Sequence, residues 1–206
     1  QYVLGEAHFY DLKFKVNSST LIPRPETEEL VKYILSHDFN SVLDIGTGSG
    51  CIAISIAKHT DSNVTAIDIS SKAIDIAKVN AKLNSVDVNF IVDDVFNFCY
   101  EKKYDLIVSN PPYISLEERE TLSSAVKDFE PEAALFGGRD GLDFYRLLAS
   151  KGRQVLLAGG YLLLEIGYEQ AAAVKLLLEQ EGWSEIKVFR DLGGRDRVVQ
   201  ARASYG

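Results

Sequence analysis

From Ser41 onward the chain alternates short apolar runs with amphipathic stretches, and this alternation limits its fold more than any other feature. Each apolar run has the length of a buried strand, and the stretches between them carry apolar residues at helical spacing. Such alternation predicts a parallel sheet with helices on both faces, because parallel strands need crossover connections. We expect strands at residues 42–45, 64–67, 88–92, 104–109, 160–166, 184–190 and 197–201, and helices that end near residue 59 and span residues 70–83, 141–157 and 168–181.

The last two expected strands are separated only by residues 191–196, which is too short for a helical crossover. They should therefore pair antiparallel, which predicts a seven-stranded, mostly parallel sheet with one antiparallel strand at the end. Ahead of the sheet, residues 6–16 alternate apolar and polar side chains, as in a short β-hairpin. A polar helical stretch is expected at residues 116–127. The fold class is thus α/β and Rossmann-like, with an N-terminal β-hairpin.

Composition limits the function classes. A chain of 206 residues suits one compact domain, and its formal charge of −8 argues against a broad phosphate-binding surface. We therefore expect no stable nucleic-acid partner; an acidic surface is compatible with a basic protein partner. Two cysteines and three scattered histidines predict neither a disulfide framework nor a metal site. No apolar run approaches a membrane span, so we expect a cytoplasmic protein. We also expect it to be a monomer.

We divide the chain into residues 1–36, a hairpin with a linker helix, and residues 37–206, a domain that contains the expected sheet. The linker helix follows a Pro-bounded loop that begins near Leu21. Because the chain begins at Gln1 and contains no methionine, we expect it to be a piece of a longer protein.

A glycine-rich turn, residues 46–50, follows the first strand of the expected sheet. Its glycines let the backbone pass close beneath a ligand, and the helix N-terminus behind them offers free N–H groups. The Gly-x-Gly-x-Gly spacing differs from the Gly-x-Gly-x-x-Gly of dinucleotide sites, and the Lys-Ser/Thr pair of a phosphate loop is absent. The turn alone leaves the type of cofactor open.

Acidic residues follow the next two strands. Asp68 ends a strand 18 residues after Gly50, where its carboxylate can accept hydrogen bonds from both hydroxyls of a ribose. The competing interpretation is a helix cap, because two serines begin the next helix. Asp93 and Asp94 follow the third strand, where a carboxylate can meet an adenine amino group and an apolar neighbour can cover the ring. Two solvated turn aspartates are the alternative.

The discriminating motif is Asn-Pro-Pro-Tyr at residues 110–113, directly after the fourth strand. Two prolines make the backbone rigid at the sheet edge where a cofactor would lie. The carbonyl groups of Asn110 and Pro111 can each accept one hydrogen of a planar NH2 group, which orients its nitrogen for methylation and stabilises the positive charge that grows there. Tyr113 can stack on a flat amide or base. The alternative is an ordinary Pro-rich turn with an Asx cap.

With these residues identified, the chain resembles the PrmC/HemK family, the N5-glutamine methyltransferases of peptide chain release factors, over nearly its whole length. Asn-Pro-Pro-Tyr also occurs in adenine-N6 DNA and guanine-N2 RNA methyltransferases. The segment Pro-Arg-Pro-Glu-Thr-Glu is far more specific, and it separates this family from ribosomal-protein glutamine methyltransferases. The motifs that carry the resemblance are residues 22–28, 43–50, 109–113, 130–131, 134–138, 141–142, 164–167 and 191–197.

The resemblance implies a class I methyltransferase fold, S-adenosylmethionine as cofactor with S-adenosylhomocysteine as product, and the glutamine of a Gly-Gly-Gln loop as substrate. Asn110 and Pro111 would hold the glutamine amide, with Pro112 completing the motif and Tyr113 as a wall. Relatives often have Gly-Asp where this chain has Asp93 and Asp94, which weakens the adenine assignment. The implied cofactor-binding residues are Gly46, Thr47, Gly48, Ser49, Gly50, Asp68, Ile69, Asp94, Val95 and Asn110.

The resemblance also places Arg24 and Thr27 near the substrate pocket, and implies an N-terminal helical domain, missing here, that helps to grip the release factor. Two alternatives stay open. One is a methyltransferase for adenine N6 or guanine N2 in nucleic acid, which the acidic balance disfavours. The other is a non-catalytic cofactor-binding module, which the intact Asn110 and Tyr113 disfavour.

Overall fold

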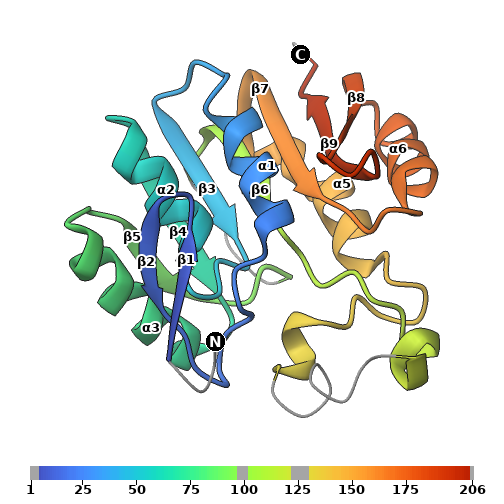
Figure 1. Ribbon diagram of the computed structural model, residues 1–206. Coiled ribbons are helices and arrows are strands. Elements are labelled where there is room, and N and C mark those ends of the chain that lie inside the picture. Colours follow the sequence, from blue (N-terminus) through green and yellow to red (C-terminus); the bar gives the residue numbers. More distant parts are fainter. Residues whose placement is uncertain (1–4, 97–101, 122–129, 205–206) are drawn as a thin grey trace.

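A two-stranded hairpin precedes a seven-stranded sheet that carries helices on both faces (Figure 1). The computed structural model describes residues 5–96, 102–121 and 130–204. The described elements are β1 (Glu6–Phe9), β2 (Leu12–Lys15), α1 (Pro25–Ile34), β3 (Ser41–Ile45), α2 (Cys51–His59), β4 (Asn63–Asp68), α3 (Ser71–Asn84), β5 (Asn89–Val92), β6 (Tyr104–Ser109), the 3-10 helices η1 (Leu116–Thr121) and η2 (Glu132–Ala134), α5 (Asp143–Val155), β7 (Leu156–Glu165), α6 (Ala171–Gln180), β8 (Ser184–Arg190) and β9 (Asp196–Arg202).

The sheet has the strand order β5-β4-β3-β6-β7-β9-β8. The first five of these strands pair parallel, whereas β9 pairs antiparallel with both β7 and β8. The predicted α/β fold with one antiparallel strand is therefore confirmed. That strand is the last in the chain, but it lies between β7 and β8 and does not form the edge of the sheet.

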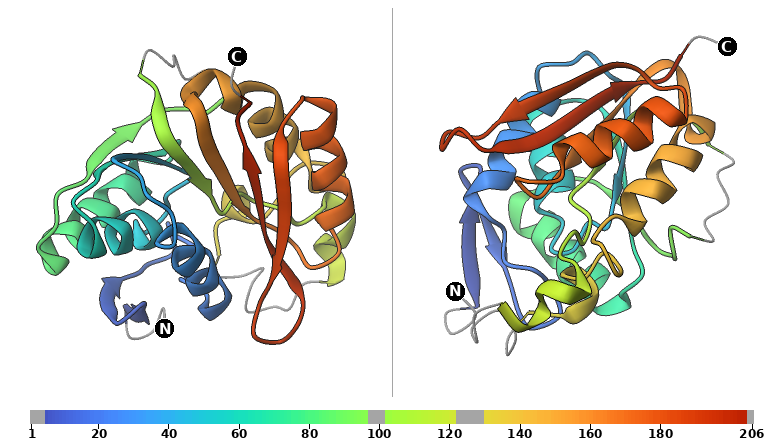
Figure 2. Two further views of the ribbon diagram at one scale, coloured as in Figure 1. Left: turned by 90° about the horizontal axis from the view of Figure 1, so that it is seen from above. Right: turned by 90° about the vertical axis from the view of Figure 1, so that its right-hand side faces the viewer.

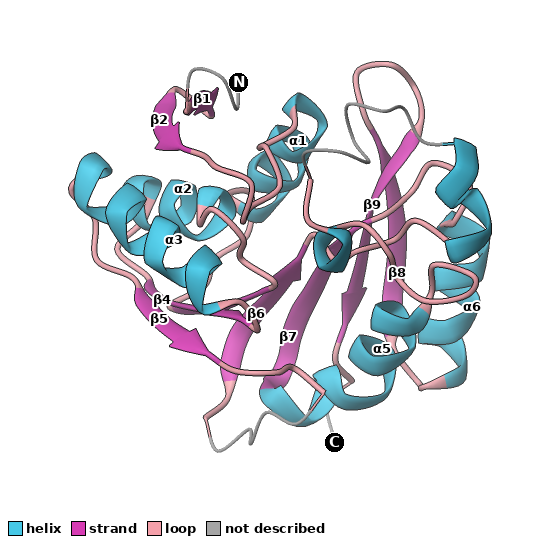
Figure 3. Cartoon of the chain, turned by 90° about the horizontal axis from the view of Figure 1, so that it is seen from below, coloured by secondary structure: helices cyan, strands magenta, loops and turns pink. Residues whose placement is uncertain are grey.

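Two apolar cores lie on opposite faces of the sheet. Helices α1, α2 and α3 cover one face, and α5 and α6 cover the other (Figure 2 and Figure 3). Neighbouring residues of a strand alternate between the cores, so Leu106 packs toward the first and Ile107 toward the second. The hairpin β1–β2 joins the first core through Phe9 and Phe14, whose rings meet edge-on. Both faces are thus buried, which leaves the strand ends as the place for a site.

The predicted boundary between α5 and β7 was wrong. Helix α5 ends at Val155, and β7 begins at once with Leu156, where we expected a helix to residue 157 and a strand from residue 160. Strand β7 instead contains Gly159, with a φ of 76°, and Gly160, beside a register shift against β6. Glycines permit such a bulge, so this pair lies within the strand and not in a loop. The polar stretch begins as a 3-10 helix at residues 116–121, and residues 122–127 lie outside the described part.

Within the described residues no helix is both long and apolar enough to cross a membrane. The same residues contain no group of three or more His, Cys, Asp or Glu side chains that could hold a metal ion. Cys51 is buried with a free thiol, whose pKa burial raises to about 12, and Cys99 lies outside the described part.

Candidate active site

The glycine-rich turn joins β3 to α2 at the carboxyl edge of the sheet. The N–H groups of Gly46 and Thr47 donate to the carbonyl of Ile67 at 2.9 and 3.0 Å, which ties the turn to β4. Gly46 and Gly48 have φ values of 73° and 55°, and an added Cβ at either would meet no atom within 4 Å. Gly46 and Gly48 therefore allow the positive φ that the turn requires, and they leave open space above it.

Gly50 serves packing. Its φ is 81°, and an added Cβ would lie 2.9 Å from Cδ1 of Ile54 and 3.1 Å from Cβ of Ala77. The residue begins α2 where that helix presses against α3. We therefore assign Gly50 to helix contact, whereas the earlier glycines of the turn face the cavity described below.

Asp68, half-buried at the end of β4, connects two turns. Its Oδ2 accepts a hydrogen bond from the Gly48 N–H and its Oδ1 accepts one from the Ser70 N–H, each at 2.9 Å. Burial raises the pKa of this carboxyl, while the two N–H groups act in the opposite direction. A carboxylate has about four acceptor positions, so Asp68 retains the capacity to accept from a ligand. The helix cap is the neighbouring Ser70, whose hydroxyl accepts from the Ala73 N–H.

Beyond β5, Asp94 and Phe96 form the next part of the edge. The Asp94 Oδ1 accepts from the Phe96 N–H at 2.9 Å, so this carboxylate also shapes its own turn. The Phe96 ring meets Phe144 edge-on with a centroid distance of 5.2 Å. These rings, together with Ile69 and Val95, give an apolar lining to this end of the site.

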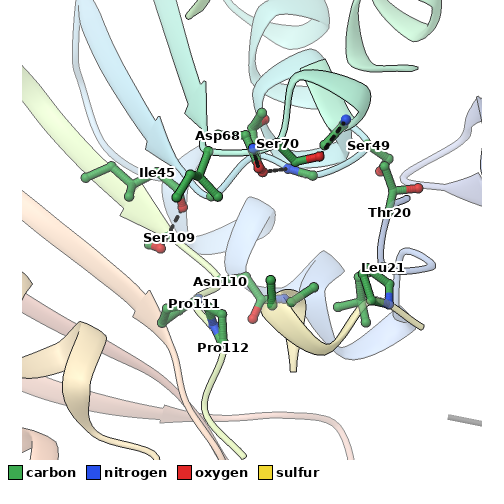
Figure 4. Close-up of a pocket in the computed structure, with 18 of the residues that line it drawn as sticks. Thr20, Leu21, Ile45, Ser49, Asp68, Ser70, Ser109, Asn110, Pro111 and Pro112 are labelled. Carbon is green, nitrogen blue, oxygen red and sulfur yellow. Dashed lines mark hydrogen bonds between the residues drawn. The ribbon is translucent and has the colours of Figure 1, made fainter. Parts of the chain in front are cut away.

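These segments surround one cavity of about 620 Å³. Figure 4 shows Asp68 and Ser70 on one side of it and residues 110–112 on the opposite side, with Thr20 and Leu21 on a third. Every predicted site residue except Gly50 and Tyr113 lines this cavity. The predicted residues that the structure brings together here are Arg24, Thr27, Gly46, Thr47, Gly48, Ser49, Asp68, Ile69, Asp94, Val95, Asn110, Pro111 and Pro112.

Asn110 follows β6 beside the end of β3. The Ser109 hydroxyl donates to the Ile45 carbonyl at 2.7 Å, which holds the two strand ends together (Figure 4). The Asn110 Nδ2 donates to Thr27 Oγ1 at 3.2 Å, so its side-chain oxygen is left for other partners. Among the described residues no donor is bonded to that oxygen or to the Pro111 carbonyl. Asn110 and Pro111, which both line the cavity, thus each keep an acceptor oxygen without a donor among the described residues.

Tyr113 is not among the residues that line the cavity. Its backbone carbonyl accepts from the Gln170 side chain at 2.9 Å, and burial raises the pKa of its hydroxyl to about 12. Its role as a wall for the substrate stays a prediction. Two glycines fit against this segment: an added Cβ on Gly137 would lie 2.3 Å from the Pro112 carbonyl oxygen, and one on Gly141 would lie 2.3 Å from the Tyr113 carbonyl oxygen. Close backbone packing therefore explains two glycines of the resemblance motifs.

Two side-chain interactions hold the Pro-Arg-Pro-Glu-Thr-Glu segment in the site. Arg24 forms an ion pair with Glu130, whose side chain is almost wholly buried. Thr27, in the first turn of α1, is 2% exposed and reaches Asn110 as described. The segment thus lines the cavity beside Asn110.

Sequence reasoning missed two buried carboxylates at the sheet edge. Asp44 in β3 accepts a 2.6 Å hydrogen bond from the Thr47 hydroxyl, and Glu165 ends β7 beneath Asn110. Burial raises the pKa of each to about 7. Both lie inside motifs that carry the resemblance, but the position of Glu165 next to Asn110 follows only from the pairing of β6 with β7. The lining residues that were not predicted include Ser19, Thr20, Leu21, Ile22, Pro23, Lys72, Phe136 and Phe144.

The fold and this cavity define the chain as a methyltransferase of class I. The methyltransferase small domain family model matches residues 25–135. A methyltransferase from Pyrococcus furiosus superposes with a TM-score of 0.74 at 19% identity, covering 95% of this chain and 90% of that one. A Thermus thermophilus 16S rRNA N2 G1207 methyltransferase, solved in complex with AdoMet and guanosine, gives 0.65 at 16% identity, covering 96% and 49%.

The chain belongs to the release factor glutamine methyltransferase family. The enzyme of that name from Thermodesulfovibrio yellowstonii is 43% identical and covers 97% of this chain, which spans 74% of the relative. The Streptococcus pneumoniae enzyme is 44% identical, with shares of 97% and 73%. The Bacillus subtilis enzyme is 42% identical, with shares of 98% and 74%.

Proposed function

We propose that this chain transfers a methyl group from S-adenosylmethionine to the side-chain amide nitrogen of the glutamine in the Gly-Gly-Gln motif of peptide chain release factors. The observation that carries the proposal is the pair of free acceptors, Asn110 Oδ1 and Pro111 O, on the wall opposite Asp68. The names of the relatives supply the substrate class.

The two acceptors would help an amide nitrogen to act as a nucleophile. An amide nitrogen is a poor nucleophile because its lone pair is delocalised into the carbonyl group. When Asn110 and Pro111 each accept one of its hydrogens, the NH2 group is fixed in orientation, and the positive charge that grows on nitrogen is stabilised. No general base with a pKa near 7 is required before attack, since the proton can leave afterwards.

The rest of the cavity fits S-adenosylmethionine, which supplies an electrophilic methyl group when bound. Gly46 and Gly48 leave open space above the turn, so the backbone can lie against a ligand. Asp68 keeps acceptor capacity for ribose hydroxyls. The apolar end around Phe96 suits a flat adenine ring.

Methylation of nucleic-acid bases would use the same acceptors, but two observations count against it. The chain carries a formal charge of −8, which disfavours phosphate binding. The similar curated proteins also carry the release-factor name. We propose a protein substrate and no stable nucleic-acid partner.

The test is incubation of the purified chain with methyl-labelled S-adenosylmethionine and a purified bacterial release factor, followed by mass spectrometry of the Gly-Gly-Gln peptide. We expect one added methyl group on the glutamine side chain. A methyl group on another residue, or label in nucleic acid but not in protein, would contradict the proposal.

A further inference from the structure

Glu165 lies directly beside the Asn110 segment although it does not line the cavity. Strands β6 and β7 pair in parallel with Ser109 opposite Leu164, so the residues that follow, Asn110 and Glu165, lie side by side, and Glu165 is still paired with Val198 of β9. The Glu165 residue is 1% exposed. Its Oε2 has no hydrogen-bond partner among the described residues. A buried carboxylate placed in this way costs stability, so its position calls for a functional reason.

The donors that face this carboxyl belong to the site. Hydrogen bonding by the Thr27 and Asn110 side chains lowers the pKa of Glu165, against the larger effect of burial, and Asn110 itself donates from Nδ2 to Thr27 Oγ1. The nearby cation, Arg197, forms an ion pair with Asp191 at 3.3 Å and donates to the Ile166 carbonyl. Within the described part, Arg197 has no ion pair with Glu165. The carboxyl therefore acts mainly on Thr27 and Asn110.

We propose that Glu165 is a positioning residue that sets which end of the Asn110 carboxamide faces the cavity. This inference rests on the proposed function of Asn110. The two ends of a carboxamide have nearly the same shape, so hydrogen bonds must choose between them. A carboxylate only accepts, so it selects the NH2 end of Asn110 and leaves the oxygen for the substrate.

Thr27 strengthens this choice. A threonine hydroxyl has one hydrogen, and when that hydrogen is donated to Glu165, only lone pairs are left to face Asn110. The Asn110 side chain must then present an N–H, as the 3.2 Å bond from Nδ2 to Thr27 Oγ1 shows. Glu165 thus controls Asn110 both directly and through Thr27.

Protonation of Glu165 would remove this control, because a carboxylic acid can donate as well as accept. Burial raises the pKa of Glu165 to about 7. We therefore expect catalysis to fall as the pH drops below about 7. The charged and titratable groups that surround Glu165 are Arg197 of β9, Glu26 of α1, Cys51 of α2, Tyr145 of α5 and Tyr113 after β6.

The direct test is nuclear magnetic resonance of the Asn110 side-chain amide in ¹⁵N-labelled protein, assigned by its loss in Asn110→Ala. In the unaltered chain the amide signal should titrate with a midpoint near pH 7, and Glu165→Gln should abolish the titration and shift the signal. An Asn110 amide signal that is the same with and without Glu165→Gln would overturn the proposal.

Kinetics give a second readout. Glu165→Gln should lower kcat for release-factor methylation by roughly 10- to 100-fold and remove the acid limb of the pH profile, because a misplaced group costs about this much. Affinity for S-adenosylmethionine should change by less than about 2-fold. Thr27→Val should lower kcat in the same direction, and Thr27→Ser should restore most of it. A retained acid limb in Glu165→Gln would count against the proposal.

Asp105→Asn is the matched control. Asp105 is a part-buried carboxylate at the opposite end of the sheet, where it accepts from the N–H groups of Asn40 and Ser41 and from the Ser41 hydroxyl. Its loss should lower thermal stability without changing the pH profile of catalysis. If the unaltered chain leaves the Gly-Gly-Gln glutamine unmodified while the Asn110 amide responds to Glu165→Gln, the proposed function fails and the positioning role stands.

Discussion

At the scale of single residues, the proposed methyl transfer depends on one side-chain oxygen. The NH2 group of the Asn110 side chain donates a hydrogen bond to Thr27, which leaves the side-chain oxygen for a substrate. If Asn110 were only an Asx cap of the turn, its side-chain oxygen would accept a hydrogen bond from a backbone N–H. No such bond occurs among the described residues. The residue therefore has a free acceptor in a rigid, proline-bounded position.

Asn110→Ala should lower kcat for methyl transfer by roughly 100- to 1000-fold, because it removes an acceptor that matters most in the transition state. Affinity for S-adenosylmethionine, measured by titration calorimetry, should stay within about 3-fold, since the turn and Asp68 are untouched. Transfer at an unchanged rate would show that Asn110 has another role.

The raised pKa of Asp44 predicts how the free energy of unfolding depends on pH. Burial raises its pKa from 3.8 to about 7, so between these values the folded chain holds a proton that the unfolded chain has released. Stability should therefore fall as the pH rises through this window and level off above about 7.

Asp44→Asn should flatten this dependence. In urea unfolding between pH 5 and pH 7, the free energy of unfolding of the unaltered chain should fall by up to roughly 1 kcal/mol more per pH unit than that of the variant. The pKa of Glu165 is raised as well, and this adds the same pH dependence to the free energy of unfolding of the unaltered chain and of the variant. The difference between the two proteins therefore reports the effect of Asp44. Parallel curves would contradict the assignment.

At the scale of elements, Gly50 separates the packing of α2 against α3 from the lining of the cavity. Gly50→Ala should lower stability by about 1–3 kcal/mol through the close contacts with Ile54 and Ala77. Gly194→Ala is the control, because Gly194 has a similar φ of 79° but open space around it. We expect the control to cost about 1 kcal/mol, which is the backbone strain alone. Equal losses in thermal or urea unfolding would refute the packing role.

Gly137 connects the Ala-Leu-Phe-Gly-Gly segment to the active-site prolines. A Cβ there would lie 2.3 Å from the Pro112 carbonyl oxygen, so Gly137→Ala must displace that segment. We expect kcat to fall by roughly 10- to 100-fold while affinity for S-adenosylmethionine changes little. Unchanged kinetics in a folded variant would show that the segment yields without moving Asn110.

The sequence predicted the sheet well, because period and turn residues report directly on strands and helices. Strand β6 was predicted with its observed bounds, since an apolar run ends there at an Asn-Pro pair. The start of β7 could not be predicted, because Gly159 and Gly160 mark a loop by composition and a bulge only by their pairing with β6. The inner position of β9 likewise follows from long-range pairing.

The site was predictable where a local motif carries its own chemistry, as the glycine turn and Asn110 do. The role of Glu165 could not be predicted in this way, because its partners come from α1 and from the segment after β6. The Arg24–Glu130 ion pair joins residues 106 positions apart, which no local pattern encodes. Contacts between residues far apart in the sequence therefore decide which polar side chains lie together in the site.

At the scale of the whole molecule, the sheet edge brings together segments from both halves of the chain. The glycine turn and Asp68 come from the first half, Asn110 follows a central strand, and the α1 segment closes the side. In the proposed function, one end of this cavity holds the nucleoside of the cofactor and the other end holds the glutamine amide. This combination is what a transfer between two bound molecules requires.

The most direct measurement is a crystal structure of the chain with S-adenosylhomocysteine and a Gly-Gly-Gln peptide. We predict that the glutamine nitrogen lies within about 3.2 Å of both Asn110 Oδ1 and the Pro111 carbonyl oxygen, and faces the cofactor sulfur. A glutamine amide bound elsewhere, or an Asn110 side chain that presents its NH2 group to the substrate, would contradict the account.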